Sequence, residues 1–164
     1  MTKHTPAKHA PAADFISRLN AERDALRVFV TLLKAEQQAL IEGHTEQLLA
    51  LSDSKTQAVH ELSKLASARK NDLLAHSAEI KAGGIAVWLQ AHAAGSLPVW
   101  QELQQLAEEV QYLNRTNGTL IQTKLRHNQQ ALTALHNAAN SAHGLYGADG
   151  QPHLPSSGRI LGSV

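Results

Sequence analysis

The chain has 164 residues, of which 15 are Lys or Arg and 14 are Asp or Glu, so its formal net charge is +1. This balance excludes the basic excess that nucleic-acid binders carry, and the lack of cysteine excludes disulfides, thiolate metal sites and cysteine nucleophiles. Hydrophobic residues make up 43% of the chain but aromatic residues only 4%, and the many Leu and Ala residues favour helices.

The N-terminal stretch contains lysines and histidines but no apolar run that could serve as a signal peptide. No apolar run elsewhere approaches the length of a membrane span. We therefore expect a soluble, cytoplasmic protein.

The spacing of glycine and proline divides the chain into segments. These residues are absent from Ala12 to Glu42 and from His44 to Ala82, and only Gly118 occurs between Val99 and His143. Because Gly and Pro interrupt regular structure, the pattern predicts three long helices.

The first helix carries apolar residues three and four positions apart, as one face of a helix requires. They are Phe15, Leu19, Leu26, Phe29, Leu33 and Leu40. Glu22 and Glu36 fall on the same stripe. Asp14 is expected either to cap this helix or to lie in its first turn, and Gly43 to end it.

The second helix is expected to begin with Thr45 as its N-cap and to end at Gly83–Gly84. Two basic residues, Lys55 and Arg69, lie on its apolar stripe. We expect their methylene groups to cover apolar surface while their charges stay in water.

A short apolar run, Ile85–Leu89, follows and should form one or two helical turns that pack Trp88 against the other helices. The third long helix should start near Ser96, with Pro98 in its first turn, where a missing N–H costs little. Its apolar stripe continues to Leu135.

Asn117-Gly118 could signal a hairpin turn, but the apolar residues on both sides keep helical spacing, so the helix should continue. Gly118 would then mark either a close approach by another element or a weak point in the helix.

Together these segments predict an all-α fold, an elongated antiparallel helical bundle of three long helices with a short connecting helix. The expected boundaries are a disordered N-terminal segment at 1–13, a helical domain at 14–143 and a flexible C-terminal tail at 144–164.

The ten histidines do not suggest a metal site, since no His-x-x-x-His or His-Glu-x-x-His pattern occurs. Asp72 and His76 share a helix face, but two ligands make an incomplete site. No nucleophile elbow, Walker loop or dinucleotide-binding glycine motif is present. We expect no catalysis, no metal and no cofactor.

Three strings near the end of the chain are distinctive. They are the Tyr112–Ile121 run (YLNRTNGTLI), the Asn128–Leu132 run (NQQAL) and the Leu145–Gln151 run (LYGADGQ), of which the last is the most specific. Their order and spacing resemble those of FlgN-type flagellar export chaperones. The close match covers roughly residues 100–151, and the helical pattern before it also fits.

This resemblance implies a cytosolic chaperone of the flagellar type III export system. FlgN-type proteins bind the two hook–filament junction proteins, FlgK and FlgL, and prevent their premature assembly. They deliver these clients to the export gate and its ATPase complex. No catalysis, cofactor or nucleic acid is implied.

A client helix could lie against the apolar stripe of the third helix. The predicted client-binding residues are Asn117, Gly118, Leu120, Ile121, Leu125, Asn128, Leu132 and Leu135. The alternative for each leucine is ordinary packing inside the protein. Leu145 and Tyr146 are predicted to dock at the export gate, as the family resemblance implies, or else to pack on the helix end.

Three other functions stay open at this point. The chain could be a structural coiled-coil or adaptor protein, a secretion chaperone with a different client, or a small helical enzyme. The sequence also leaves monomer or homodimer undecided, because either state can cover the apolar stripes.

Overall fold

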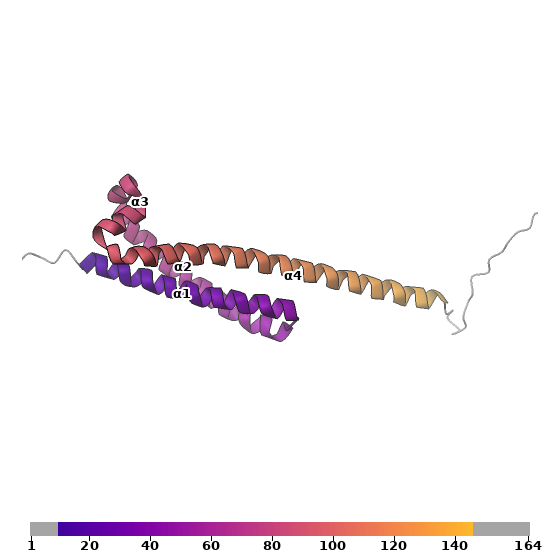
Figure 1. Cartoon of the computed structure of the whole chain (residues 1–164). Helices are drawn as coiled ribbons and strands as arrows, with labels where there is room; N and C mark the ends of the chain where they lie inside the picture. The colour runs from indigo at the N-terminus through magenta and orange to yellow at the C-terminus, as the bar shows by residue number, and fades with distance from the viewer. Residues whose placement is uncertain (1–9, 146–164) are drawn as a thin grey trace, which may run out of the picture. The chain divides into compact units, whose positions relative to one another are not determined.

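The computed structural model describes the backbone of residues 10–145, and this part of the chain is helical, without strands. Its elements are α1 (Ala10–Glu42), α2 (Thr45–Ala75), α3 (Ser77–His92), the short 3-10 helix η1 (Ala94–Ser96) and α4 (Leu97–Leu145) (Figure 1). The chain forms two units, one up to Ile121 and one from Gln122 onward, and α4 belongs to both. The predicted all-α class is confirmed.

Two predicted boundaries differ from the structure. α1 begins at Ala10, so Asp14 lies inside the helix rather than at its start. α4 extends to Leu145, two residues beyond the expected end of the helical domain. The predictions for 1–9 and 146–164 lie outside the described residues.

Gly43 and His44 form the short connection between α1 and α2. Gly43 has a φ of 79°, and the N–H groups of Gly43 and His44 both donate to the carbonyl of Ala39, at 2.9 and 3.0 Å. This is the hydrogen-bond pattern of a glycine-terminated helix, so the predicted stop at Gly43 is confirmed. Thr45 is already helical, and the cap position belongs to His44, which makes no side-chain capping bond.

The predicted end of the second helix at Gly83–Gly84 is wrong. α2 ends at Ala75, and His76 separates it from α3. The His76 ring lies 4.9 Å from the Trp88 ring, centroid to centroid, so this break coincides with a tertiary contact that the spacing of Gly and Pro does not reveal. Gly84 does interrupt the helix, but inside α3, with φ 81° and ψ 168°.

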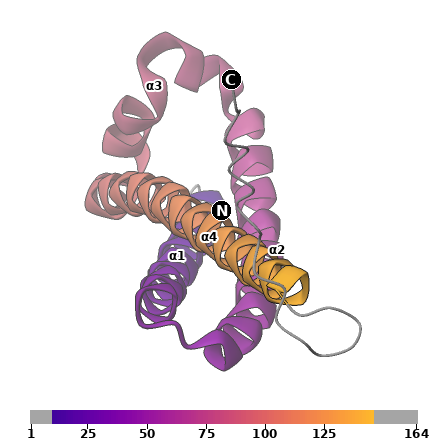
Figure 2. The same ribbon diagram turned by 90° about the vertical axis from the view of Figure 1, so that its right-hand side faces the viewer.

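Trp88 holds α3 against the start of α1, as predicted. Its side chain is buried, the edge of the Phe15 ring meets it at 5.4 Å and 88°, and the His92 ring stacks on it at 5.2 Å. Leu89 is fully buried beside it. α3 thus leads from the end of α2 toward the start of α4 (Figure 2).

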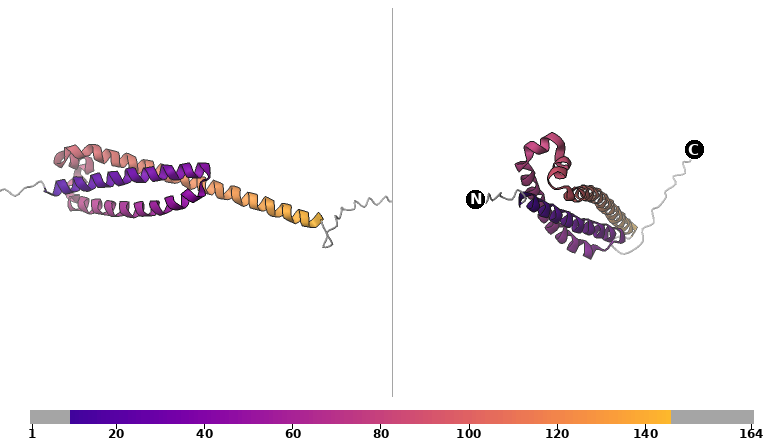
Figure 3. Two further views of the ribbon diagram at one scale, coloured as in Figure 1. Left: turned by 90° about the horizontal axis from the view of Figure 1, so that it is seen from below. Right: turned by 60° about the vertical axis from the view of Figure 1, so that its left-hand side comes forward.

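Ion pairs define the directions of the long helices in the first unit. Arg18 of α1 donates to Asp72 of α2 at 2.8 and 3.0 Å, near the start of one helix and the end of the other, so these two helices are antiparallel. Arg27 and Lys34 of α1 pair with Glu102 and Glu109 of α4 in ascending order, so α1 and the first part of α4 are parallel. Figure 3 shows these segments side by side.

The predicted apolar stripe of α1 forms the centre of the first unit. Five predicted members pack in two clusters with residues of α3 and α4: Phe15, Leu19, Leu26, Phe29 and Leu33. Val30, which the predicted stripe did not include, joins the second cluster, and Leu40 is buried outside both clusters. Burial of this stripe accounts for the packing of α1 with its neighbours.

Substitution of Gly118 by alanine should stabilise the protein, because α4 is helical there and a Cβ would meet no neighbouring group within 4 Å. We expect Gly118→Ala to raise the free energy of unfolding by about 0.5–1 kcal/mol. Gly84→Ala is the matched control: it also has open space, but its φ of +81° should cost about 1–3 kcal/mol. Urea denaturation measures both, and equal effects of the two substitutions would contradict the assignment.

Candidate protein-binding surface

Some leucines of α4 are buried in the first unit, whereas three leucines of α4 in the second unit are exposed. Leu103 and Leu113 are 4% and 5% exposed. Leu125, Leu132 and Leu135 are 55%, 66% and 68% exposed, and every residue from Leu125 to Ser141 is exposed. The second unit therefore presents a row of leucines to solvent.

These leucines lie on one face of the helix. With Asn128 they occur at alternating steps of three and four, which places side chains on one helix face. We call Leu125, Asn128, Leu132 and Leu135 the α4 strip. Large apolar side chains in a row at this exposure indicate an interaction surface.

The candidates just before the strip lie in the first unit. Leu120 is half-buried and Ile121 is 39% exposed. No group packs closely on Gly118, so of the two alternatives for this glycine the structure rules out a close approach and leaves the weak point in the helix. The side chain of Leu145 and all of Tyr146 lie outside the described residues.

Asn117 is part of the interior, which contradicts its predicted contact with a client. Its side chain is 1% exposed. The Nδ2 group donates to the backbone carbonyl of Leu33 at 2.9 Å and to Oε2 of Glu36 at 2.8 Å. Asn117 therefore ties α4 to α1, and we leave it out of the proposed contact surface.

A second helix joins the same polar contact. Lys55 of α2 donates from Nζ to both carboxylate oxygens of Glu36, at 2.9 and 3.2 Å. Asn117, Glu36 and Lys55 thus connect three helices, and we call them the asparagine layer. Asn117 Oδ1 has no partner among the described residues.

A similar contact lies further along the first unit. Arg69 of α2 donates to Glu22 of α1 at 2.7 Å, and its guanidinium lies 5.6 Å from the ring centroid of Trp100 in α4. The Glu22 side chain is 5% exposed. We call Glu22, Arg69 and Trp100 the tryptophan layer.

These two layers correct a prediction about the stripe residues of α2. Lys55 and Arg69 were expected to keep their charges in water, but each pairs with the glutamate that interrupts the stripe of α1. The signal was present in the sequence, because Glu22 and Glu36 are separated by the same number of residues as Lys55 and Arg69. Opposite charges at equal spacing on two antiparallel helices can pair in a single register.

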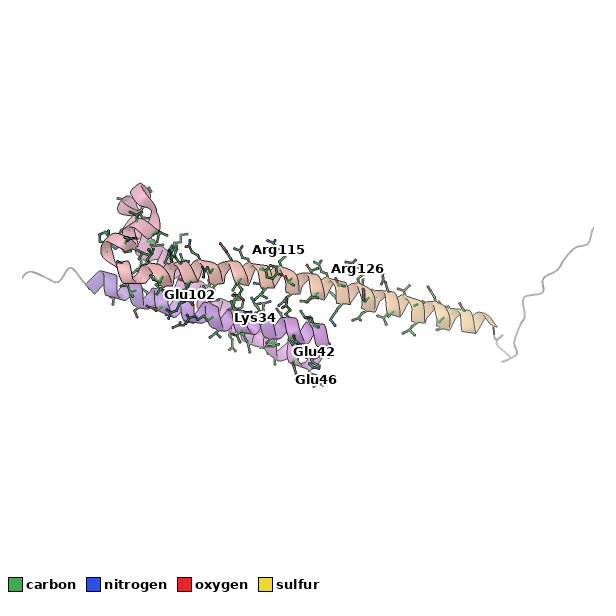
Figure 4. The ribbon with its side chains drawn as sticks, viewed as in Figure 1. Lys34, Glu42, Glu46, Glu102, Arg115 and Arg126 are labelled. Atoms are coloured by element: carbon green, nitrogen blue, oxygen red, sulfur yellow. The ribbon has the colours of Figure 1, made fainter. Side chains whose placement is uncertain are left out.

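The charge of α4 changes along its length. Glu108 and Glu109 are its last acidic residues, and from Val110 to Leu145 its only charged residues are Arg115, Lys124 and Arg126. Figure 4 labels Arg115 and Arg126 on this part of α4. The α4 strip therefore lies on a purely cationic stretch of helix.

The described residues form neither a metal site nor a membrane span. In the described part of the chain, no three His, Asp or Glu side chains come together as a metal site would require. None of the helices between residues 10 and 145 combines the length and apolarity needed to cross a membrane.

Comparison with known proteins supports the resemblance noted in the sequence. A sequence model of the FlgN protein family matches residues 12–153. The chain belongs to the FlgN family. Two similar proteins, each named Flagella synthesis protein FlgN, come from Yersinia enterocolitica, one of them from serotype O:8 / biotype 1B (strain NCTC 13174 / 8081). Each is 47% identical to this FlgN-family chain over 53 residues.

Those alignments cover 31% of this chain and 33% of each relative, so the matched part is about a third of the relatives' length. No solved structure matches the chain. The match over most of the chain thus establishes the family. The activity and partners of this chain are proposed below.

The asparagine layer predicts a pH-dependent variant. Asn117→Ala should cost about 1–3 kcal/mol of stability, because it removes two buried hydrogen bonds. Asn117→Asp should cost more at neutral pH, because it places a buried carboxylate beside that of Glu36.

Burial and the neighbouring carboxylate should raise the pKa of the introduced carboxyl in the folded state. The folded protein then binds a proton that the unfolded chain has released, so the deficit of Asn117→Asp should shrink as the pH falls from about 7 to about 5. Urea denaturation of both variants and the parent at each pH measures this. A stability deficit of Asn117→Asp that does not change with pH would show that the side chain at position 117 is not buried.

Proposed function

We propose that this FlgN-family chain is a flagellar export chaperone that binds hook–filament junction proteins, FlgK-like and FlgL-like, before their export. It keeps these clients from assembling early and delivers them to the export gate. The observation that carries the proposal is the α4 strip, whose three leucines are all more than half exposed.

The energetics favour a helix as the client element. Covering a fully exposed leucine stabilises a complex by about 1.5–3 kcal/mol, so the half-exposed leucines of the strip would each contribute about half of that. A client helix lying along α4 can cover all of them with side chains at the same three- and four-residue spacing. Asn128 within the strip would favour one register, as a polar residue in an apolar seam does.

The charge of α4 favours a client over a second copy of the chain. Two copies that pair through this stretch would bring Lys124 and Arg126 together with other cations and with no carboxylate from the same stretch. Like charges in an interface oppose association. A client helix with acidic residues beside its apolar face would instead be attracted.

We further propose that Leu145 and Tyr146 dock at the export gate and its ATPase complex. The support is the LYGADGQ string, which resembles the corresponding string of the family. The chaperone works in the cytoplasm by covering a partner helix, and this function involves no catalysis and no cofactor.

The client proposal is tested by two pairs of substitutions on α4. Leu125→Asp with Leu132→Asp should reduce binding of a C-terminal helical fragment of a junction protein by at least about tenfold, since carboxylates replace the apolar contact. Isothermal titration calorimetry measures this. Gln130→Asp with Asn137→Asp is the matched control, because it adds the same charge to exposed positions outside the strip.

Circular dichroism should show that both double variants keep the helix content of the parent. Equal client binding by the folded Leu125/Leu132 variant would overturn the assignment of the strip. If light scattering shows that the parent is a dimer and the Leu125/Leu132 variant a monomer, a second copy of the chain is the partner that covers the strip.

The docking proposal is tested at Tyr146. Tyr146→Ala should leave the affinity for the client fragment unchanged and weaken binding to the cytoplasmic part of the export gate, with Tyr146→Phe as the control that keeps the ring. Pull-down of the chaperone–client complex by the gate measures the difference. Loss of client binding with intact gate binding would assign the opposite role to this residue.

A further inference from the structure

A second candidate surface lies in the first unit, between α2 and α3, the two helices seen together in Figure 2. It is an open groove of about 510 Å³, which we call the α2–α3 groove. Its main lining residues are Ser67, Lys70, Leu73, Leu74, Ile80 and Lys81. It shares no residue with the α4 strip.

The floor of the groove is apolar and packs against the core of the first unit. Leu73 and Ile80 pack against the buried cluster that includes Phe15 and Trp88. Leu74 lies beside them and is 59% exposed. The small side chain of Ser67 lines the same groove and leaves room for another helix to approach closely.

The rim of the groove is basic. Lys70 and Lys81 are exposed, and in the described part of the chain neither forms an ion pair. On α2, Asp72 is engaged by Arg18 through two hydrogen bonds, and on α3 the acidic residue nearest to Lys81 in sequence is Glu79. Lys70 and Lys81, which form no ion pair within the described residues, therefore line the groove beside its apolar floor.

We propose that the α2–α3 groove binds an amphipathic helix of another protein, one that carries acidic residues beside its apolar ridge. The apolar ridge would cover Leu74 and the floor, and the acidic residues would pair with Lys70 and Lys81. This arrangement combines helix-in-groove packing with charge complementarity.

The exposed apolar stripe of this chain's own α4 does not fit the groove. The only charged residues between Val110 and Leu145 are basic, so a second copy would bring cations to a cationic rim. The α4 stripe of a second copy is therefore disfavoured as the occupant, whereas an acidic amphipathic helix of another protein matches the charge of the rim. This surface goes beyond the proposed client site and allows the chaperone to hold two partners on separate elements.

The full chain can be tested with two fluorescein-labelled synthetic peptides of equal length. Both have leucines at helical spacing, flanked by glutamate in one peptide and by lysine in the other. By fluorescence anisotropy, the glutamate peptide should bind at least about tenfold more tightly, and added salt should weaken it. Equal affinities, or no binding of the glutamate peptide, would overturn the proposal.

Paired variants locate the binding site. Lys70→Glu with Lys81→Glu should reduce binding of the glutamate peptide by about tenfold or more, and so should Ser67→Trp, which fills the groove without changing its charge. Lys64→Glu with Arg115→Glu is the matched control, because both residues are exposed and neither lines the groove or belongs to the α4 strip. This control should leave the affinity unchanged. The same measurement on a chain with Leu125→Asp and Leu132→Asp removes the apolar contact of the α4 strip, and complete loss of peptide binding there would assign the peptide to α4 and overturn the proposal.

Discussion

The first unit depends on two partly buried polar layers, each with one residue from α1, one from α2 and one from α4. Glu22, Arg69 and Trp100 form the tryptophan layer, and Glu36, Lys55 and Asn117 form the asparagine layer. Buried ion pairs contribute little net stability, because desolvation offsets the attraction. Their effect is on register: any slip of one helix would leave a buried charge without its partner.

A defined register decides which side chains of α4 are inside. Asn117 lies against Leu33 and Glu36, so the apolar residues that precede it, such as Leu113, meet the core formed by α1. Among the described residues of the second unit, Leu125, Leu132 and Leu135 are exposed. One helix thus contributes to a folded core and also presents an exposed apolar face.

This division suits a protein that works by covering another helix. The FlgN-family chain presents an apolar strip on a cationic helix in one unit, and an apolar groove with a basic rim in the other. The two surfaces would favour acidic amphipathic helices and disfavour self-association through α4. The proposed chaperone function would need this selectivity, because the exposed leucines of two copies would otherwise pair with each other.

The sequence by itself determined the all-α class, the turn at Gly43, the start of α4 near Pro98 and the family, because these follow from local backbone preferences and short strings. Periodicity shows which face of a helix is apolar but not which helix packs against that face. The tertiary structure decided those neighbours. α2 ends just before His76, whose ring packs against the Trp88 ring. Lys55 and Arg69 of α2 pair with glutamates of α1. The tertiary structure also buried Asn117 and left Leu125 exposed on the same helix, because Asn117 lies in the part of α4 that packs against α1 within the first unit.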